Sequence, residues 1–289
     1  MSYRTTMHAT PARADRGLFR QPLAVKVPEI TLMFWVIKIL TTAGGEATSD
    51  YLSLGNRMAG GVIEAGIFVV ALILQFRTRK YTAAAYWLLA YAIAIFGTGI
   101  ADAMHLFIGI PYAGTTTLWA IVLAVIFWLW HRSEGTLSIH SVITTRREIY
   151  YWATVFATFA LGTAVGDLTA TTFHLGYLAS GVMFFVVILI PAVLWSGLKV
   201  NSVFCFWFGY VITRPLGASF ADYASKPHNI SGANFGDGPT AAVATVLVVI
   251  LVAYLAVSGH GVQKPAEAGT APGGGPEAGR PRDHRRALS

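Results

Sequence analysis

Eight apolar segments, each about 20 residues long, occupy most of this 289-residue chain. An α-helix of about that length crosses the hydrocarbon core of a bilayer, which is about 30 Å thick. The segments are continuous, whereas strands of a membrane barrel would alternate apolar and polar residues. The sequence therefore predicts an all-α, polytopic membrane protein with eight transmembrane helices in contact with lipid. The expected spans are 30–52, 60–76, 83–107, 116–130, 149–170, 175–195, 203–223 and 240–257.

Composition agrees with this class and argues against several others. Hydrophobic residue types make up 55% of the chain and charged types 12%, about half the charged share of a soluble domain. The single cysteine, Cys205, excludes an internal disulfide and a thiolate metal cluster. The chain has no HExxH, CxxC, Walker or dinucleotide-binding glycine motif and no nucleophile–base constellation. We therefore expect neither an enzyme nor a bound cofactor.

Basic residues gather on one side of the predicted helices. Most of the 21 Lys and Arg precede the first helix or follow an even-numbered one, and only Arg57 and Lys226 flank the other side. Loops on the cytoplasmic side of membrane proteins carry such an excess. We therefore expect a multi-pass protein of the bacterial inner membrane with both termini in the cytoplasm. Because the charge reports topology, a nucleic-acid partner is not expected.

The two ends of the chain differ from the apolar part. Residues 1–25 lack the apolar core of a signal peptide, and residues 261–289 are rich in Pro, Gly, Ala and Arg. We expect both to be disordered cytoplasmic segments. Between them, residues 26–260 form one membrane domain.

A fourfold repeat organises this domain, with boundaries at about 26–80, 81–140, 141–198 and 199–260. Each copy has an aromatic residue followed by Trp, then Gly ten residues and Asp fifteen residues after the Trp. These positions are Trp35, Gly45 and Asp50; Trp87, Gly97 and Asp102; Trp152, Gly162 and Asp167; and Trp207, Gly217 and Asp222. An even-numbered helix follows each copy, which predicts four two-helix hairpins of parallel orientation. The similar stretches "GTGIAD" and "GASFAD" favour a further pairing of the hairpins into two halves.

These residues, with the opening "KVPEITLMFWVIKILTTAGGEATSDYL", resemble a family of bacterial membrane proteins. Its members have four tandem repeats, each with two transmembrane helices and a marked Trp, catalogued as domain of unknown function 347. The resemblance covers about residues 26–257. It implies the architecture and no activity.

We interpret the repeated Trp as interfacial or as packing between repeats, in preference to ligand binding. The repeated Gly is typical of close approach between membrane helices. Two adjacent glycines in "TTAGGE" (41–46) mark the most favourable place for an unwound stretch that exposes carbonyl groups to an ion.

Carboxylates inside the predicted spans are the candidate ion-binding groups. The four repeat aspartates recur at one depth, Glu46 lies one turn before Asp50, and Glu64 lies in the second helix. An ionised group at the bilayer centre costs roughly 3 kcal/mol, so such groups face a bundle interior or a water-filled path. The aspartates would form one ring or two paired sites. Alternatively, they are hydrated or cap the next helix, which would give them a structural role.

Lys38 and Arg214 are the candidate internal counter-charges. Each lies too far along its helix from its own aspartate to meet it, so pairing across helices is expected, for example Lys38 with Glu64 or Arg214 with Glu46. Pro215 predicts a kink or break in the seventh helix. Transporters often place binding sites at broken helices. The sequence therefore also allows an alternative in which Arg214 binds an anionic substrate.

One histidine stands near a repeat aspartate. Asp102 and His105 are three residues apart and share a helix face, which suits a proton relay or a metal ion. His131, His140 and His174 are interpreted as loop or interface residues.

The sequence thus predicts a secondary transporter of a small cation, such as a divalent metal, coupled to protons. Asp50, Asp102, Asp167, Asp222, Glu46 and His105 would handle the ion or proton. The alternatives are a non-transporting membrane scaffold or sensor, and a transporter of a small anionic metabolite bound through Arg214.

Overall fold

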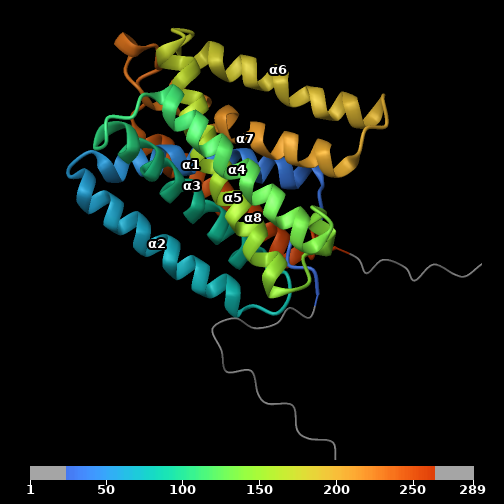
Figure 1. Ribbon diagram of the computed structural model, residues 1–289. Helices are drawn as coiled ribbons and strands as arrows, with labels where there is room; N and C mark the ends of the chain where they lie inside the picture. Colours follow the sequence, from blue (N-terminus) through green and yellow to red (C-terminus); the bar gives the residue numbers. More distant parts are fainter. Residues whose placement is uncertain (1–23, 264–289) are drawn as a thin grey trace, which may run out of the picture.

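The computed structural model describes residues 24–263; the expectations for both chain ends beyond these lie outside the described residues. Within this part the fold is all-helical, with eight long helices and three short helical segments (Figure 1). The long helices are α1 (Leu32–Ser53), α2 (Arg57–Arg77), α3 (Ala83–Leu106), α4 (Tyr112–Glu134), α5 (Thr145–Asp167), α6 (Gly176–Ser196), α7 (Ser202–Ser225) and α8 (Asp237–Ser258). A π-helical turn, Leu168–Thr172, extends α5. The predicted fold class is confirmed.

Seven of these helices, α2 to α8, are long and apolar enough to cross a membrane. The remaining helix, α1, has 22 residues but carries Lys38, Glu46 and Asp50. It lies within the bundle beside the others, so its polar side chains are brought into the protein interior.

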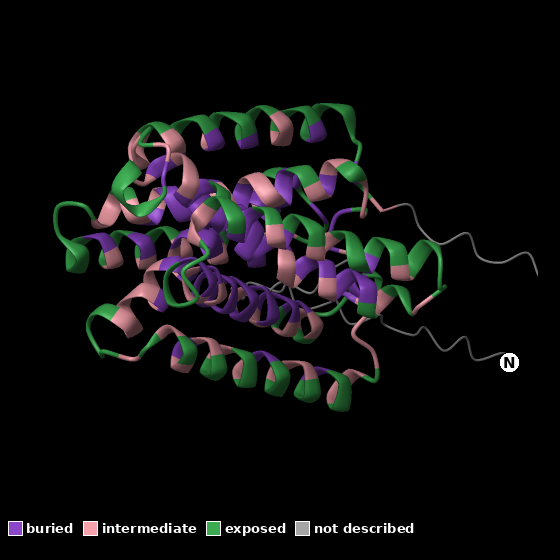
Figure 2. Cartoon of the chain, turned by 90° about the horizontal axis from the view of Figure 1, so that it is seen from above, coloured by how far each residue is buried: buried purple, intermediate pink, exposed green. Residues whose placement is uncertain are grey.

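The odd-numbered helices form the centre of the bundle. α1 packs against α3 and α7, and α5 also packs against α3 and α7, so the four close into an inner ring. The most apolar stretches of α3, α5 and α7 are 61–67% buried, against 17–28% for the even-numbered helices. Figure 2 shows the same contrast, with buried residues on the central helices and exposed ones at the periphery.

Each even-numbered helix packs mainly on the odd-numbered helix that follows it: α2 on α3, α4 on α5, α6 on α7, and α8 back on α1. The predicted four tandem two-helix repeats are present, but the main packing partner of each outer helix belongs to the next repeat. The connections on both sides of α2 are short, at residues 54–56 and 78–82, so an outer helix can reach either neighbour. Because each outer helix covers the inner helix of the next repeat, it links successive repeats. Helix α8 covers α1 and so links the fourth repeat to the first.

Both described ends of the chain lie at one end of the bundle. The amide of Glu29 donates to the Gly261 carbonyl at 2.8 Å, and the Gln263 side chain donates to the Pro28 carbonyl at 3.2 Å. We call this the termini end. The odd-numbered helices begin there and finish at the opposite end with the repeat aspartates in or beside their last turns, so we call that the acid end.

The aromatic pairs of the four repeats form a closed ring near the termini end. In each repeat the residue before the Trp contacts the Trp of the next repeat. The ring-centroid distances are 5.6 Å for Phe34–Trp87, 5.2 Å for Tyr86–Trp152, 6.0 Å for Tyr151–Trp207 and 5.9 Å for Phe206–Trp35. The same contact recurs between every pair of successive repeats. All four repeats are therefore equivalent in these contacts, and the predicted pairing into two halves is not needed to describe them.

The repeated glycines follow the same cyclic rule. A Cβ added to Gly45 would lie 2.2 Å from Ala94, and one added to Gly162 would lie 2.3 Å from the Arg214 side chain. Gly97 approaches Phe159 and Gly217 approaches Thr42 in the same way. In every case the neighbour lies seven residues after the Trp of the next repeat. The glycines therefore allow the inner helices to touch.

The expected unwound stretch in α1 and the break that Pro215 could cause in α7 are both absent from the described residues. The "TTAGGE" stretch is helical throughout α1, because Gly44 and Gly45 pack closely against Tyr91 and Ala94 of α3. Helix α7 also continues through Pro215. Thr213 donates to the Tyr210 carbonyl at 2.6 Å, and Thr42 donates to the Thr213 carbonyl at 3.2 Å. Hydroxyl groups of this kind stabilise the backbone around a proline in a membrane helix.

Candidate functional site

One face of each inner helix points to the centre of the ring. Its positions are four residues apart, the spacing that aligns side chains along a helix. From the termini end to the acid end they are Phe34, Lys38, Thr42, Glu46 and Asp50 in α1; Tyr86, Ala90, Ala94, Thr98 and Asp102 in α3; Tyr151, Val155, Phe159, Thr163 and Asp167 in α5; and Phe206, Tyr210, Arg214, Ala218 and Asp222 in α7. All are buried except Asp50, Asp102 and Asp167, which are half-buried. Polar groups therefore become more frequent toward the acid end.

Arg214 joins α7 to the three other inner helices. Its Nη2 lies 2.6 Å from Glu46 Oε2 and donates to Thr163 Oγ1 at 2.7 Å. The same nitrogen donates to Thr98 Oγ1, and Nη1 donates to the Thr42 carbonyl at 3.4 Å. The predicted pairing of Arg214 with Glu46 is confirmed. Since Arg214 has no exposed surface and both terminal nitrogens are bonded, it offers little to an anionic substrate in this conformation.

Lys38 lies nearer the termini end, and its surroundings differ from those expected. Its Nζ is 3.9 Å from the ring centroid of Phe159 and 4.3 Å from that of Tyr210, which are cation–π distances. Among residues 24–263 it has no hydrogen-bond partner. The expected pairing with Glu64 is wrong, because Glu64 accepts from Ser49 Oγ at 2.7 Å. Ser49 lies eleven residues beyond Lys38, about 16 Å along α1.

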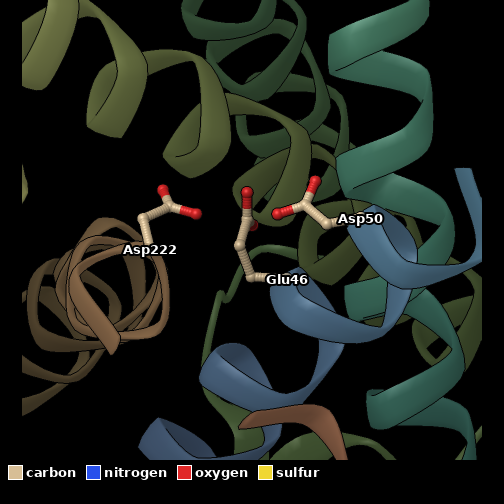
Figure 3. Close-up of side chains that lie close together, drawn as sticks. All are labelled: Glu46, Asp50 and Asp222. Carbon is tan, nitrogen blue, oxygen red and sulfur yellow. The ribbon is translucent and has the colours of Figure 1, made fainter. Parts of the chain in front are cut away.

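Three carboxylates meet at the acid end of the bundle. Oxygens of Glu46, Asp50 and Asp222 all lie within 4.8 Å of one another. Figure 3 shows these side chains pointing toward one another, two from α1 and one from α7. We call them the acid cluster. In the described part of the chain it is the one group of three or more potential metal-ligating side chains at such distances.

Lys226, the residue after α7, covers the acid cluster from the outside. Its Nζ lies 2.6 Å from Asp50 Oδ2 and 3.2 Å from Asp237 Oδ1. Burial alone would lower the pKa of Lys226, but the nearby charges of Asp50 and Asp222 outweigh it and raise the pKa above the ordinary value. The ammonium group therefore stays charged at neutral pH.

An opening of about 690 Å³ leads to this cluster from the acid end. Asp50, Glu64, Asp102, Lys226 and Asp237 contribute the ionisable lining together with Arg57. Glu64 is buried, and its Oε2 has no hydrogen-bond partner in the described part of the chain. The outermost member of the acid cluster, Asp50, is thus directly accessible from a charged cavity.

The structure brings together some of the candidate residues and separates others. Asp50 and Asp222 meet with Glu46, whereas Asp102 and Asp167 lie outside the acid cluster. His105 makes a 2.9 Å hydrogen bond between Nδ1 and the Ile110 carbonyl, and its ring stacks on Tyr112 at 3.9 Å. No third potential ligand lies within 4.8 Å of Asp102 and His105 in the described residues.

Sequence reasoning missed Thr98 and Thr163, which bind both Arg214 and Glu46. A signal was present: they occupy the position four residues before the repeat aspartate, where the first repeat has Glu46. It also missed a buried ion pair at the termini end, between Lys26 Nζ and Glu148 Oε2 at 2.7 Å.

Comparison with known proteins identifies the repeat. A family model described as "Repeat of Unknown Function (DUF347)" matches residues 33–81, 85–136, 150–200 and 205–260. No curated protein and no solved structure matches the chain. The four matched segments cover most of the chain and contain one copy each of the Trp, Gly and Asp pattern. The chain therefore belongs to the family of the Repeat of Unknown Function (DUF347).

Proposed function

We propose that this protein is a secondary transporter that binds a small cation, such as a divalent metal ion, at the acid cluster and couples its movement to protons. The observation that carries this proposal is the convergence of Glu46, Asp50 and Asp222 within 4.8 Å inside a bundle of membrane-length helices. Carboxylates this close repel one another unless a cation or protons neutralise them.

The ligand chemistry supports a hard cation. Carboxylate oxygens suit Mg²⁺, Ca²⁺ and Mn²⁺, and the acid cluster contains no sulfur or imidazole group. Metal ligands must be deprotonated, so binding of the ion releases protons and protonation releases the ion. This exchange would provide the coupling between ion and proton movement. It requires no chemical step, so the proposal includes no enzymatic activity.

The centre of the inner ring supports a carrier over an open channel. From the acid end the cavity reaches Asp50, but farther along the axis lie the buried cations of Arg214 and Lys38. The aromatic ring of the four repeats lies beyond them. A cation could pass these groups only after the inner helices rearrange, as in alternating access.

The charge distribution supports an orientation with the termini end in the cytoplasm of a bacterial cell. Of the described basic residues outside the inner ring, Arg57 and Lys226 flank the acid end, and the others flank the termini end. Those at the termini end are Lys26, Arg77, Arg79, Lys80, Arg132, Arg146, Arg147 and Lys199. Under the positive-inside rule, the opening and the acid cluster face the outside of the inner membrane.

The test is Mn²⁺ uptake by liposomes that contain the full chain, under an imposed pH gradient. Asp222→Asn removes one carboxylate of the acid cluster, and we expect it to reduce the uptake rate at least tenfold. Asp102→Asn tests the neighbouring carboxylate in the opening. Glu29→Gln is the matched control, because Glu29 is exposed at the termini end and should leave uptake unchanged. Uptake at the wild-type rate in Asp222→Asn would rule out this mechanism.

A further inference from the structure

Lys226 occupies the boundary between the opening and the acid cluster. It lines the opening, and its Nζ lies 2.6 Å from Asp50 Oδ2. Asp50 in turn lies within 4.8 Å of both Glu46 and Asp222. An ion that enters from the acid end therefore meets the Lys226 ammonium group at the first carboxylate of the cluster.

The loop that follows α7 holds Lys226 in this place. The amides of Asn234, Phe235 and Gly236 donate to the carbonyls of Lys226, Ala224 and Ser225 at 2.8, 2.9 and 3.1 Å. Residues 226–236 thus fold back onto the last turn of α7. A Cβ added to Gly232 would lie 1.8 Å from the Lys226 carbonyl oxygen, so the loop packs directly on this residue. The position of Lys226 is built into the fold.

The ion pairs of the acid cluster leave one carboxylate without a counter-ion. Arg214 neutralises Glu46, and Lys226 neutralises Asp50. Asp222 makes no ion pair with another described residue. When all three carboxylates are ionised, the cluster has one uncompensated charge with Lys226 in place and two with Lys226 moved aside.

We infer that Lys226 is a tethered cation that the transported ion must displace from Asp50, and that a divalent cation is the class of ion able to displace it. This inference rests on the proposed function. The tether gives the ammonium group a high effective concentration at Asp50. A monovalent ion would replace the single positive charge of Lys226 at Asp50 with another single positive charge, and it would lose part of its hydration shell in doing so. A divalent ion adds a charge that both Asp50 and Asp222 attract.

The test is Mn²⁺ binding to the purified full chain in lipid nanodiscs, measured by calorimetry, with Na⁺ titrated separately. Lys226→Gln removes the ammonium group, and we expect at least tenfold tighter Mn²⁺ binding. Lys226→Arg keeps the charge and should bind within twofold of wild type. Arg57→Gln is the matched control: Arg57 lines the same opening, is exposed and makes no ion pair among the described residues, so its loss should change affinity little.

The outcomes separate this inference from the function on which it rests. If wild type binds Mn²⁺, Asp222→Asn abolishes binding and Lys226→Gln leaves it unchanged or weaker, the inference is wrong and the cation site stands. If Arg57→Gln tightens binding as much as Lys226→Gln, the effect is general electrostatics and the inference is also wrong. If Asp222→Asn binds Mn²⁺ as wild type does, the site itself fails. Wild-type binding of Na⁺ as tight as that of Mn²⁺ would overturn the assignment to divalent ions.

Discussion

At the scale of single residues, the interior of this protein contains both paired and unpaired charged side chains. Arg214 and Glu46 compensate each other across α7 and α1, and two threonines complete their hydrogen bonds. Lys38 Nζ lies over two aromatic rings and has no hydrogen-bond partner within residues 24–263. Charges in such places are costly, so they persist where the fold or the function uses them. The Arg214–Glu46 pair has a structural use, because Arg214 joins all four inner helices and binds Glu46, one carboxylate of the acid cluster.

Removing one partner of this pair should destabilise the protein more than removing both. Arg214→Gln leaves Glu46 buried without a cation, and we expect a loss of about 3–5 kcal/mol in unfolding free energy. The double variant Arg214→Met with Glu46→Met leaves no isolated charge and should recover most of this loss. Denaturant unfolding in detergent, followed by tryptophan fluorescence, measures both. A double variant no more stable than Arg214→Gln would contradict the assignment.

At the scale of helices, periodicity and composition predicted most of the structure. The eight helices were found within a few residues of their ends, because membrane-length apolar runs have few alternatives to a helix. The predictions that failed depend on contacts between helices. Gly44–Gly45 and Pro215 would weaken an isolated helix, but here Gly44 and Gly45 pack closely on α3 and Pro215 packs closely on Gly162 of α5, and α1 and α7 stay continuous.

The site was only partly predictable for the same reason. Glu46, Asp50 and Asp222 were candidates from sequence, but nothing in a single helix shows that the first and last inner helices are neighbours. Asp102 and Asp167 occupy the equivalent repeat position and nevertheless lie outside the acid cluster. The pairing of Lys38 with Glu64 failed because the two residues lie at different depths: Lys38 is near the start of α1 at the termini end, and Glu64 is near the start of α2 at the acid end.

Contacts at the repeated glycines give a prediction at this scale. A Cβ at Gly217 would lie 1.8 Å from Thr42 Oγ1 and 2.9 Å from the Ile39 carbonyl, so Gly217→Ala must push α7 away from α1. We expect a loss of about 1–3 kcal/mol in unfolding free energy, measured by denaturant titration in detergent. Gly66 in α2 has open space around it. We therefore expect Gly66→Ala to leave the unfolding free energy unchanged or to raise it by up to about 1 kcal/mol. Equal effects in the two variants would show that glycine acts here through helix propensity and not through close approach.

At the scale of the whole molecule, the four repeats are equivalent at one end and unequal at the other. The aromatic contacts recur in cyclic order near the termini end. At the acid end the cluster uses only the first and fourth inner helices, which become neighbours because the ring closes and α8 covers α1. Because the termini end is symmetric and the acid end is not, we favour a single cation site between α1 and α7 over a ring of four equivalent aspartates.

The proposed direction of entry depends on how the molecule sits in the membrane, which thiol labelling can test. In a Cys205→Ser background, where the one native cysteine is buried, Gly55→Cys places a thiol in the α1–α2 connection at the acid end. His140→Cys places one in the exposed connection between α4 and α5 at the termini end. Because the basic residues gather at the termini end, we expect a membrane-impermeant maleimide to label Gly55→Cys in intact spheroplasts and His140→Cys only after permeabilisation. Uptake by the Cys205→Ser parent confirms that the background is functional, and the reverse labelling pattern would place the acid cluster on the cytoplasmic side, where it would receive ions for export.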